Sequence, residues 1–269
     1  MNINNFVINR IRRASMFSTT NGVALWNITQ VENPSLSVTT DKNEAVDALG
    51  VKIMEFERAK NAEFTAENSL FDFGLAAAQS GTEKREAAVG ATITMPKWEE
   101  VKLTQDQIGA TKITLAEVPV GTAGSEIPFI YKLNGDGTLA EKYSSGLEAA
   151  AGTFTLNAAT KELTLPTALK AGDRLWIPYE FACQNGVEVC NTAIDFPKAG
   201  KFVMEVLGVD VCDTSKEYYA YVVFPNAKLN GDFDLSFTTD GKHPFTIQAM
   251  QQYCDAEKRL FSILIPDAV

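Results

Sequence analysis

Short runs in which apolar and polar residues alternate dominate this chain from its middle to its end. Residues 152–181 show the pattern most clearly, as three runs separated by Asn/Ala/Thr and Ala-Gly-Asp turns. A period of two places alternate side chains in a core and in solvent. The segment therefore predicts three short β-strands. Further runs of this kind follow at short intervals, up to a strongly apolar last strand at Leu260–Ile265.

One segment has a helical pattern instead. Leu70, Phe73 and Ala77 share one face of a helix, Ser69 is a candidate N-cap, and Gly81 suits the C-terminal end. We expect a short α-helix at about 70–80. Closely spaced strands with turn signals between them favour a sandwich or barrel over βαβ units. The predicted fold class is therefore mainly β: an antiparallel β-sandwich or barrel with one short flanking α-helix, an extended N-terminal arm and a long hairpin or loop.

The first 22 residues have no strand signal. Residues 6–17 could form a short helix with its arginines outward, ended by the Ser18–Gly22 segment. We predict residues 1–22 to be an N-terminal arm that becomes ordered against a neighbouring molecule. A frayed terminus explains the same pattern.

Residues 23–269 are expected to form a single β-sandwich domain. Its first strands should bend near Asn33-Pro34, and a hairpin should turn at Lys60-Asn61, with Met54 and Phe56 on one face and Phe64 packed against them.

Residues 115–148 are longer and richer in glycine than a minimal domain needs, and they are our candidate for a long hairpin or a surface elaboration. Within them, Asn134-Gly-Asp-Gly137 predicts a hairpin tip. A calcium loop would need a closing acidic residue and two flanking helices.

Charge and composition narrow the function. With 269 residues and 45% apolar content, the chain can bury a substantial core. The net charge is −10, and residues 1–20 carry three arginines and no acid, which leaves −13 on the rest. An acidic body argues against broad nucleic-acid binding. It suits a surface that DNA passes without sticking, although solubility explains acidity equally well.

Nothing in the sequence predicts an association with membranes. No apolar run is long enough to cross a bilayer, and the N-terminus lacks the apolar core of a signal peptide. We therefore expect no membrane insertion, and synthesis and assembly in a cytoplasm.

Reactive groups are scarce. The single histidine, His243, lies in an Asp-Gly-Lys-His-Pro segment that predicts an exposed turn, and no nucleophile or phosphate-binding motif accompanies it. Glu99 and Glu100 would point to opposite faces of a strand, so they would not form a catalytic pair. We predict no enzyme activity, no catalytic or metal-binding residues and no cofactor.

The remaining candidate groups have ordinary interpretations. The four cysteines form no C-x-x-C pair; Cys183 and Cys190 flank a predicted hairpin turn at Asn185-Gly186 and are expected to be buried, inert thiols. Tyr219 and Tyr221 should share one strand face, with Tyr218 on the other. They could stack on sugars or bases, or they could serve a core or an interface.

The order of these elements resembles bacteriophage tail tube proteins, also called major tail proteins. Three stretches carry the resemblance: Met54–Phe73, with its hairpin followed by a helix; the ribbon that ends in residues 171–180; and the C-terminal pair Pro244–Met250 and Lys258–Asp267. The family has no short diagnostic motif and no catalytic residues to transfer.

The resemblance implies a virion structural protein that forms hexameric rings stacked into a hollow tube, through which DNA passes during ejection. Arms and a long hairpin bridge adjacent rings in such proteins. Here the candidate inter-subunit contacts are Arg10, Arg12, Arg13 and Phe17. Implied partners are other copies of the chain, the tape measure protein, the baseplate or tail terminator, and a sheath if the tail contracts.

Two other functions fit the same sequence. The chain could be a different virion component, such as a head decoration or baseplate protein. It could also be a carbohydrate-binding β module, which would need an exposed aromatic platform.

Overall fold

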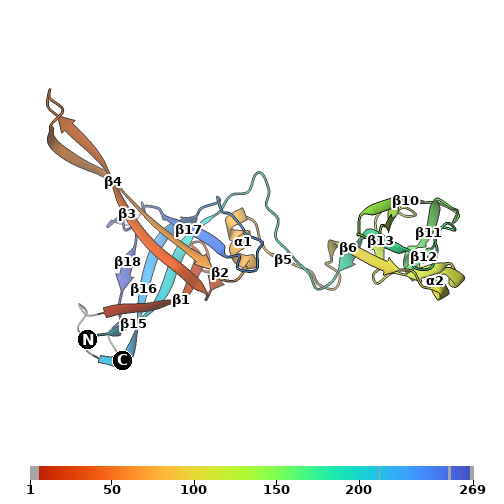
Figure 1. The fold of residues 1–269 in the computed structure, drawn as a ribbon. Helices are drawn as coiled ribbons and strands as arrows, with labels where there is room; N and C mark the ends of the chain where they lie inside the picture. Colours follow the sequence, from red (N-terminus) through yellow and green to blue (C-terminus); the bar gives the residue numbers. More distant parts are fainter. Residues whose placement is uncertain (1–5, 212, 254–255, 267–269) are drawn as a thin grey trace. The chain divides into compact units, whose positions relative to one another are not determined.

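The computed structural model describes residues 6–211, 213–253 and 256–266 and divides the chain into two compact units (Figure 1). Unit 1 comprises Met1–Lys84 and Val189–Val269, and unit 2 comprises Arg85–Glu188. This differs from the single domain predicted for residues 23–269. The reason is that each unit buries an apolar core of its own. The mainly β, antiparallel fold class is confirmed.

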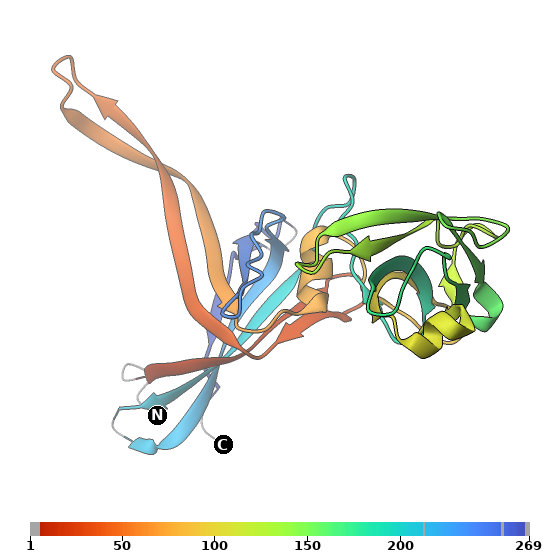
Figure 2. The same ribbon diagram turned by 45° about the vertical axis from the view of Figure 1, so that its right-hand side comes forward.

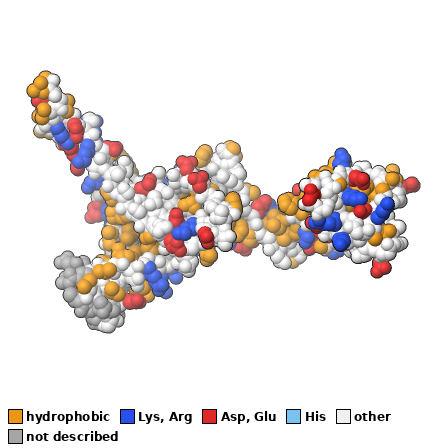
Figure 3. Space-filling model, in the orientation of Figure 1, with side chains coloured by type: hydrophobic (Ala, Val, Ile, Leu, Met, Phe, Trp, Pro, Cys, Tyr) orange, Lys and Arg blue, Asp and Glu red, His pale blue; other side chains and the backbone are white. Residues whose placement is uncertain are grey.

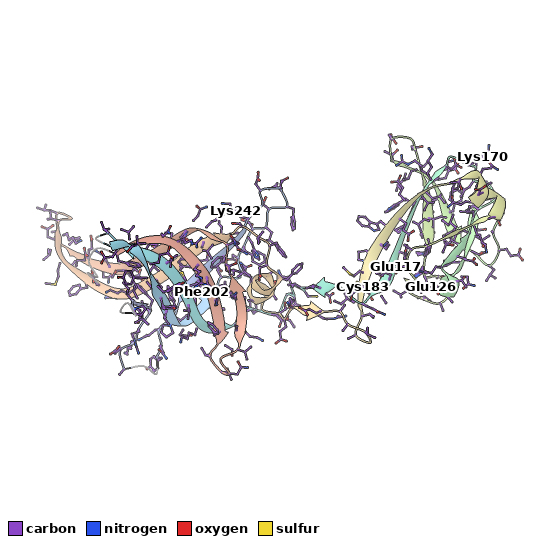
Figure 4. The ribbon with its side chains drawn as sticks, turned by 90° about the horizontal axis from the view of Figure 1, so that it is seen from below. Glu117, Glu126, Lys170, Cys183, Phe202 and Lys242 are labelled. Atoms are coloured by element: carbon purple, nitrogen blue, oxygen red, sulfur yellow. The ribbon has the colours of Figure 1, made fainter. Side chains whose placement is uncertain are left out.

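Unit 1 is built on one curled sheet. Its strands, in spatial order, are β2 (Ala24–Ile28), β1 (Phe6–Ser18), β15 (Ala199–Asp210), β16 (Asp213–Leu229), β17 (His243–Ala249), β4 (Lys52–Asn68) and β3 (Val31–Val46), with β18 (Ser262–Leu264) paired to β16. Phe202, on the curled sheet in Figure 4, packs against Trp26, Phe64 and Phe224 with ring centroids 5.6–5.8 Å apart. The inner face of the curl therefore forms the core.

Residues 6–18 of the predicted arm form strand β1, and residues 1–5 lie outside the described residues. Residues 6–18 pair along their length with β15, and Ala14–Phe17 pair with β2 on the other side. Ala14 and Met16 are fully buried. The helix considered for residues 6–17 is therefore wrong. The strand is hard to recognise from the sequence because two register shifts, between Ile8 and Arg10 and between Ile11 and Arg13, interrupt the alternation of faces.

The long hairpin is formed by β3 and β4, and it lies outside the candidate region 115–148 (Figure 2). The turn predicted at Lys60-Asn61 is wrong, because β4 runs through it without interruption. The chain reverses instead at residues 47–51, where Asp47 Oδ1 accepts hydrogen bonds from the amides of Leu49 and Val51 at 2.9 and 2.8 Å. The bend near Asn33-Pro34 is present as a register shift between Glu32 and Ser35.

Helix α1 (Phe73–Ser80) confirms the predicted helix. Its N-cap is Asp72, whose carboxylate accepts from the Leu75 amide at 2.7 Å, and Ser69 lies further upstream. Gly81 ends the helix in the left-handed region at φ 73°. A side chain there would collide with the backbone of Phe196, so only glycine fits.

Unit 2 is a smaller sheet with short strands. In spatial order they are β6 (Ile93–Lys102), β13 (Arg174–Cys183), β9 (Phe129–Leu133), β10 (Leu139–Ser145), β11 (Thr153–Asn157), β12 (Glu162–Thr164) and β7 (Lys112–Thr114), with β8 (Pro119–Val120) paired to β13. All pairings are antiparallel except β10 with β11. A second helix, α2 (Gln105–Ala110), and a 3-10 helix, η2 (Ala158–Thr160), were not predicted.

The strands predicted within residues 152–181 are confirmed as β11, β12 and β13, and the hairpin tip at Asn134–Gly137 joins β9 to β10. The hairpin predicted at Asn185-Gly186 is wrong. After β13 the chain enters β14 (Val187–Glu188), which pairs with β5 (Arg85–Glu86). This two-stranded ribbon brings the two ends of unit 2 side by side.

Candidate assembly surfaces

The four predicted contact residues lie on β1, where they belong to the sheet of their own chain. Arg10 is exposed. Arg12 Nη1 donates a hydrogen bond to the Tyr219 hydroxyl at 3.0 Å, and its guanidinium lies 5.3 Å from the centre of that ring. Arg13 and Phe17 line a shallow pocket on the face of the sheet opposite the core. The structure therefore gives Arg12 an intramolecular role, and contact with another subunit stays a prediction for all four residues.

The most prominent exposed feature of unit 1 is the outer part of the β3–β4 hairpin. Ala62 is the last buried residue of β4 on the way to the turn, and no residue from 41 to 61 is buried. At about 3.3 Å per residue, the segment from Ala62 to Val51 extends roughly 35 Å beyond the core. Its length far exceeds what packing within the unit requires.

The end of this hairpin is apolar. Six side chains, each more than half exposed, form what we call the hairpin tip: Val46, Leu49, Val51, Ile53, Met54 and Phe56. Figure 3 shows apolar side chains at the hairpin end and charged side chains below them. Met54 and Phe56 share a face as predicted, but Phe64 lies in the core against Phe202, so it does not pack with them. An apolar surface of this kind is typical of interaction sites.

Ion pairs support the hairpin where no core does. Glu55 accepts from Lys42, at 2.5 Å, and from Lys52, which also reaches Glu44 at 2.6 Å. Hydrogen bonds from Lys42 and then Lys52 lower the pKa of Glu55 to about 2. The same contacts raise the pKa values of both lysines. Fixing these long side chains across two strands favours an extended, paired hairpin.

A second charge cluster lies at the hairpin base. Lys242, just before β17, contacts Glu32 on β3 at 2.7 Å and Glu67 on β4 at 3.3 Å (Figure 4). Asn33 Nδ2 also donates to Glu67 at 2.7 Å. These hydrogen bonds lower the pKa values of Glu32 and Glu67. The cluster ties the base of the hairpin to the neighbouring strand segment.

Unit 1 also has a groove between α1 and β2. A cavity of about 540 Å³ is lined by both elements, including Leu25, Trp26, Ala77 and Ala78, with Lys84 and Lys198 at its border. It is mostly apolar, and it lies on the same unit as the hairpin.

His243 differs from the exposed turn residue predicted. It is 1% exposed, with Nε2 2.7 Å from Gln79 Oε1 and its ring stacked on Phe71. The Asp72 amide donates to Nδ1, so the neutral ring donates from Nε2. Burial lowers the His243 pKa, partly opposed by the charge of Asp72. This arrangement joins α1 to β17 and is structural.

The other polar candidates do not form a reaction centre. Glu99 hydrogen-bonds the Tyr179 hydroxyl, whereas Glu100 pairs with Arg174, so the two acids face apart as predicted. Cys183 is partly buried, but Cys190 is exposed, which corrects the expectation for that thiol; Cys212 and Cys254 lie outside the described residues. In the described part of the chain, no cluster of potential metal ligands occurs and no helix is long and apolar enough to span a membrane.

The sequence also matches a family model, described as the YomU/Tube protein family, over residues 6–259. The chain belongs to the YomU/Tube family. Membership identifies it as a structural protein of the phage tail tube type and a component of the virion. The match spans both units, so unit 2 falls within the family region. A search of curated proteins found no match.

The hairpin tip is the main surface that sequence reasoning missed. Its signal was the segment Asp47-Ala-Leu-Gly50, since an Asp that accepts from following amides and a Gly at φ 82° make a turn. Alternation on both sides of Lys60-Asn61 favoured that dipeptide instead, but it lacks the glycine and the Asp side-chain hydrogen bonds that make the turn at residues 47–51.

Proposed function

We propose that this chain is the repeating subunit of the phage tail tube, in which hexameric rings stack around a channel that DNA crosses during ejection. Family membership supports the tube. The observation that carries the mode of assembly is the β3–β4 hairpin, whose apolar tip lies far from the core of its own unit. Burial of that tip against another copy would remove apolar surface from water.

The geometry of the tip suits contacts along the tube axis. A tip on one copy that enters a different surface of the next copy makes a heterologous contact, which repeats without closing and generates a filament. The α1–β2 groove is our candidate for the receiving surface, because it is apolar and belongs to the same unit.

Lateral contacts within a ring are best supplied by sheet edges. Strands β2 and β3 terminate the sheet of unit 1, so among the described strands each has one side without a paired neighbour. Exposed edges that pair with edges of another copy are a known route to assembly. The predicted contact residues Arg13 and Phe17 lie on β1, next to edge strand β2.

The net charge of −10 supports the role in ejection, because an acidic lining would repel phosphates and let DNA slide. Assembly would take place in the host cytoplasm with the tape measure protein, the baseplate or tail terminator, and a sheath if the tail contracts. Labelling the chain in intact particles would separate a tail position from a head or baseplate position.

A single substitution in the hairpin tip tests the proposal. Leu49 is 88% exposed, so Leu49→Asp should leave the fold intact but place a charge in the contact. We expect tubes from the native chain in negative-stain electron microscopy at high concentration, and none from the variant. Leu147→Asp is the matched control, because Leu147 is fully exposed in unit 2. Monomers alone from the native chain, or normal tubes from Leu49→Asp, would contradict the proposed assembly.

A further inference from the structure

Unit 2 has a row of three aromatic side chains, one exposed and two half-buried, that nothing above explains. Trp98 on β6, Trp176 on β13 and Tyr131 on β9 lie on three adjacent strands and form what we call the aromatic platform. The Trp98 and Trp176 rings are 6.3 Å apart, and those of Tyr131 and Trp176 are 5.4 Å apart. Tyr131 lies directly opposite Trp176, whereas Trp98 lies opposite Pro178, so the platform runs diagonally across the three strands.

The platform lies on the outer face of the sheet. Along β13, Leu175, Ile177 and Tyr179 point into the core of unit 2, and the alternate position Trp176 therefore faces outward. Trp98 is 71% exposed, an unusual state for an indole that already has an aromatic neighbour. The core of unit 2 does not need this ring, so its exposure suggests a ligand.

Polar groups adjoin the rings in fixed positions. Arg174 Nε donates to Glu100 Oε1 at 2.7 Å, and its Nη1 donates to the Gly135 carbonyl at 3.4 Å. Glu100 lies opposite Trp176 in the register between β6 and β13. The pair offers donors and acceptors side by side without net charge, which matches the paired hydroxyl groups of a sugar.

We propose that the aromatic platform binds a neutral polysaccharide built of flat, equatorially linked hexopyranose units. The CH face of such a sugar packs on an aromatic ring, and its hydroxyls reach the Glu100–Arg174 pair at the border. Two strand spacings of about 4.8 Å and an offset of two residues along the strands separate Tyr131 from Trp98, a diagonal of about 12 Å that is close to the length of a disaccharide. An extended sugar chain therefore fits along the row.

Two other occupants suit the surface less well. A nucleic acid also stacks on aromatics, but unit 2 has nine Lys and Arg against thirteen Asp and Glu, which opposes phosphate binding. A protein interface needs about 800 Å² on each partner. The outer face around the platform instead presents exposed charges at Glu100, Lys102 and Glu180. A narrow, uncharged polymer is the better match.

Native gel electrophoresis of the full chain in gels that contain hydroxyethyl cellulose or glycol chitin tests the proposal. Retardation is expected, together with a change in tryptophan fluorescence, because the platform holds two of the three tryptophans. Trp98→Ala should weaken binding by roughly two- to tenfold, the size expected for loss of one stacking partner. Its side chain is mostly exposed, so the fold should survive. Trp176→Ala should weaken binding in the same way. If that variant misfolds, Trp98→Ala alone decides the test.

The control is Phe237→Ala, which removes a 91% exposed aromatic from unit 1 and should leave retardation unchanged. No retardation by either polymer, or retardation that Trp98→Ala does not reduce, would overturn the proposal. Loss of tubes in Trp98→Ala without any polysaccharide binding would also overturn it and would assign the platform to subunit contacts. Tube formation is scored separately, so failure of this inference leaves the proposed function standing.

Discussion

The two units use the same alternating strands for different purposes. Unit 2 encloses its core with strands of ten residues or fewer. Unit 1 contains strands of 16 and 17 residues, and two of them, β3 and β4, continue beyond the core as a hairpin supported by ion pairs. A strand longer than its core is not explained by the stability of the unit. From this difference we propose that unit 1 supplies the assembly surfaces and that unit 2 has a separate role.

The separation of the two cores gives the largest expected effect. Phe154 in unit 2 and Phe202 in unit 1 are both fully buried, and truncation of each to alanine should cost about 3–5 kcal/mol. We expect scanning calorimetry to resolve two transitions, with Phe154→Ala lowering one and Phe202→Ala lowering the other. A single transition that both variants lower equally would contradict the division into units.

A pH effect between pH 5 and 7 should arise in unit 1, which contains the only histidine of the chain. Burial lowers the His243 pKa below its ordinary value of 6.5, so as pH falls the unfolded state takes up the proton first. The contribution of neutral His243 to the stability of unit 1 is therefore complete above pH 6.5 and declines as pH falls from 6.5 towards the folded-state pKa, at up to about 1.4 kcal/mol per pH unit.

Denaturant unfolding between pH 5 and 7 measures how the free energy of unfolding changes with pH. His243→Leu is the reference, because the chain has no other histidine. The variant should be less stable at pH 7, through loss of the Gln79 contact, but its stability should change less with pH. If the free energy of unfolding changed equally with pH in the native chain and in His243→Leu, then His243 would not be the cause of the pH effect.

The smallest effect concerns the ion pairs of Glu55 with Lys42 and Lys52 on the β3–β4 hairpin. The pKa of Glu55 is lowered from 4.5 to about 2, so its contribution is complete above pH 4.5 and is lost as pH falls towards 2. Amide exchange of residues 42–57 should be slower in the native chain than in Glu55→Gln at pH 6, and the difference should vanish near pH 2. Comparison at equal pH cancels the intrinsic pH dependence of exchange. Equal protection of the native chain and Glu55→Gln at pH 6 would show that these ion pairs do not stabilise the hairpin.

Sequence patterns predicted the parts of the fold that have regular alternation and a matching turn. Strands β11 to β13 and helix α1 fall in this class. Strand β1 was missed because bulges break its alternation, and the hairpin because outer β3 and β4 have no buried face to impose a pattern.

The site was harder to predict than the fold. Arg12 and Arg13 were selected for their charge, but the structure places them on a sheet in which Arg12 already has a partner. The hairpin tip and the aromatic platform both depend on which side chains remain exposed after folding. Exposure is a property of the tertiary structure, and a chain with 45% apolar residues does not show which of them stay outside the core.

We propose that unit 1 forms the tube through contacts of its β3–β4 hairpin. Because β5 and β14 pair at the junction, with Arg85 opposite Glu188, a short Gly-Ser linker can join Lys84 to Val189 in place of unit 2. Electron microscopy of this shortened chain beside the full chain with Leu49→Asp tests the claim directly. We predict tubes from the shortened chain and none from the hairpin variant. Tubes from the hairpin variant and none from a folded shortened chain would show that tube formation depends on unit 2 and not on the hairpin.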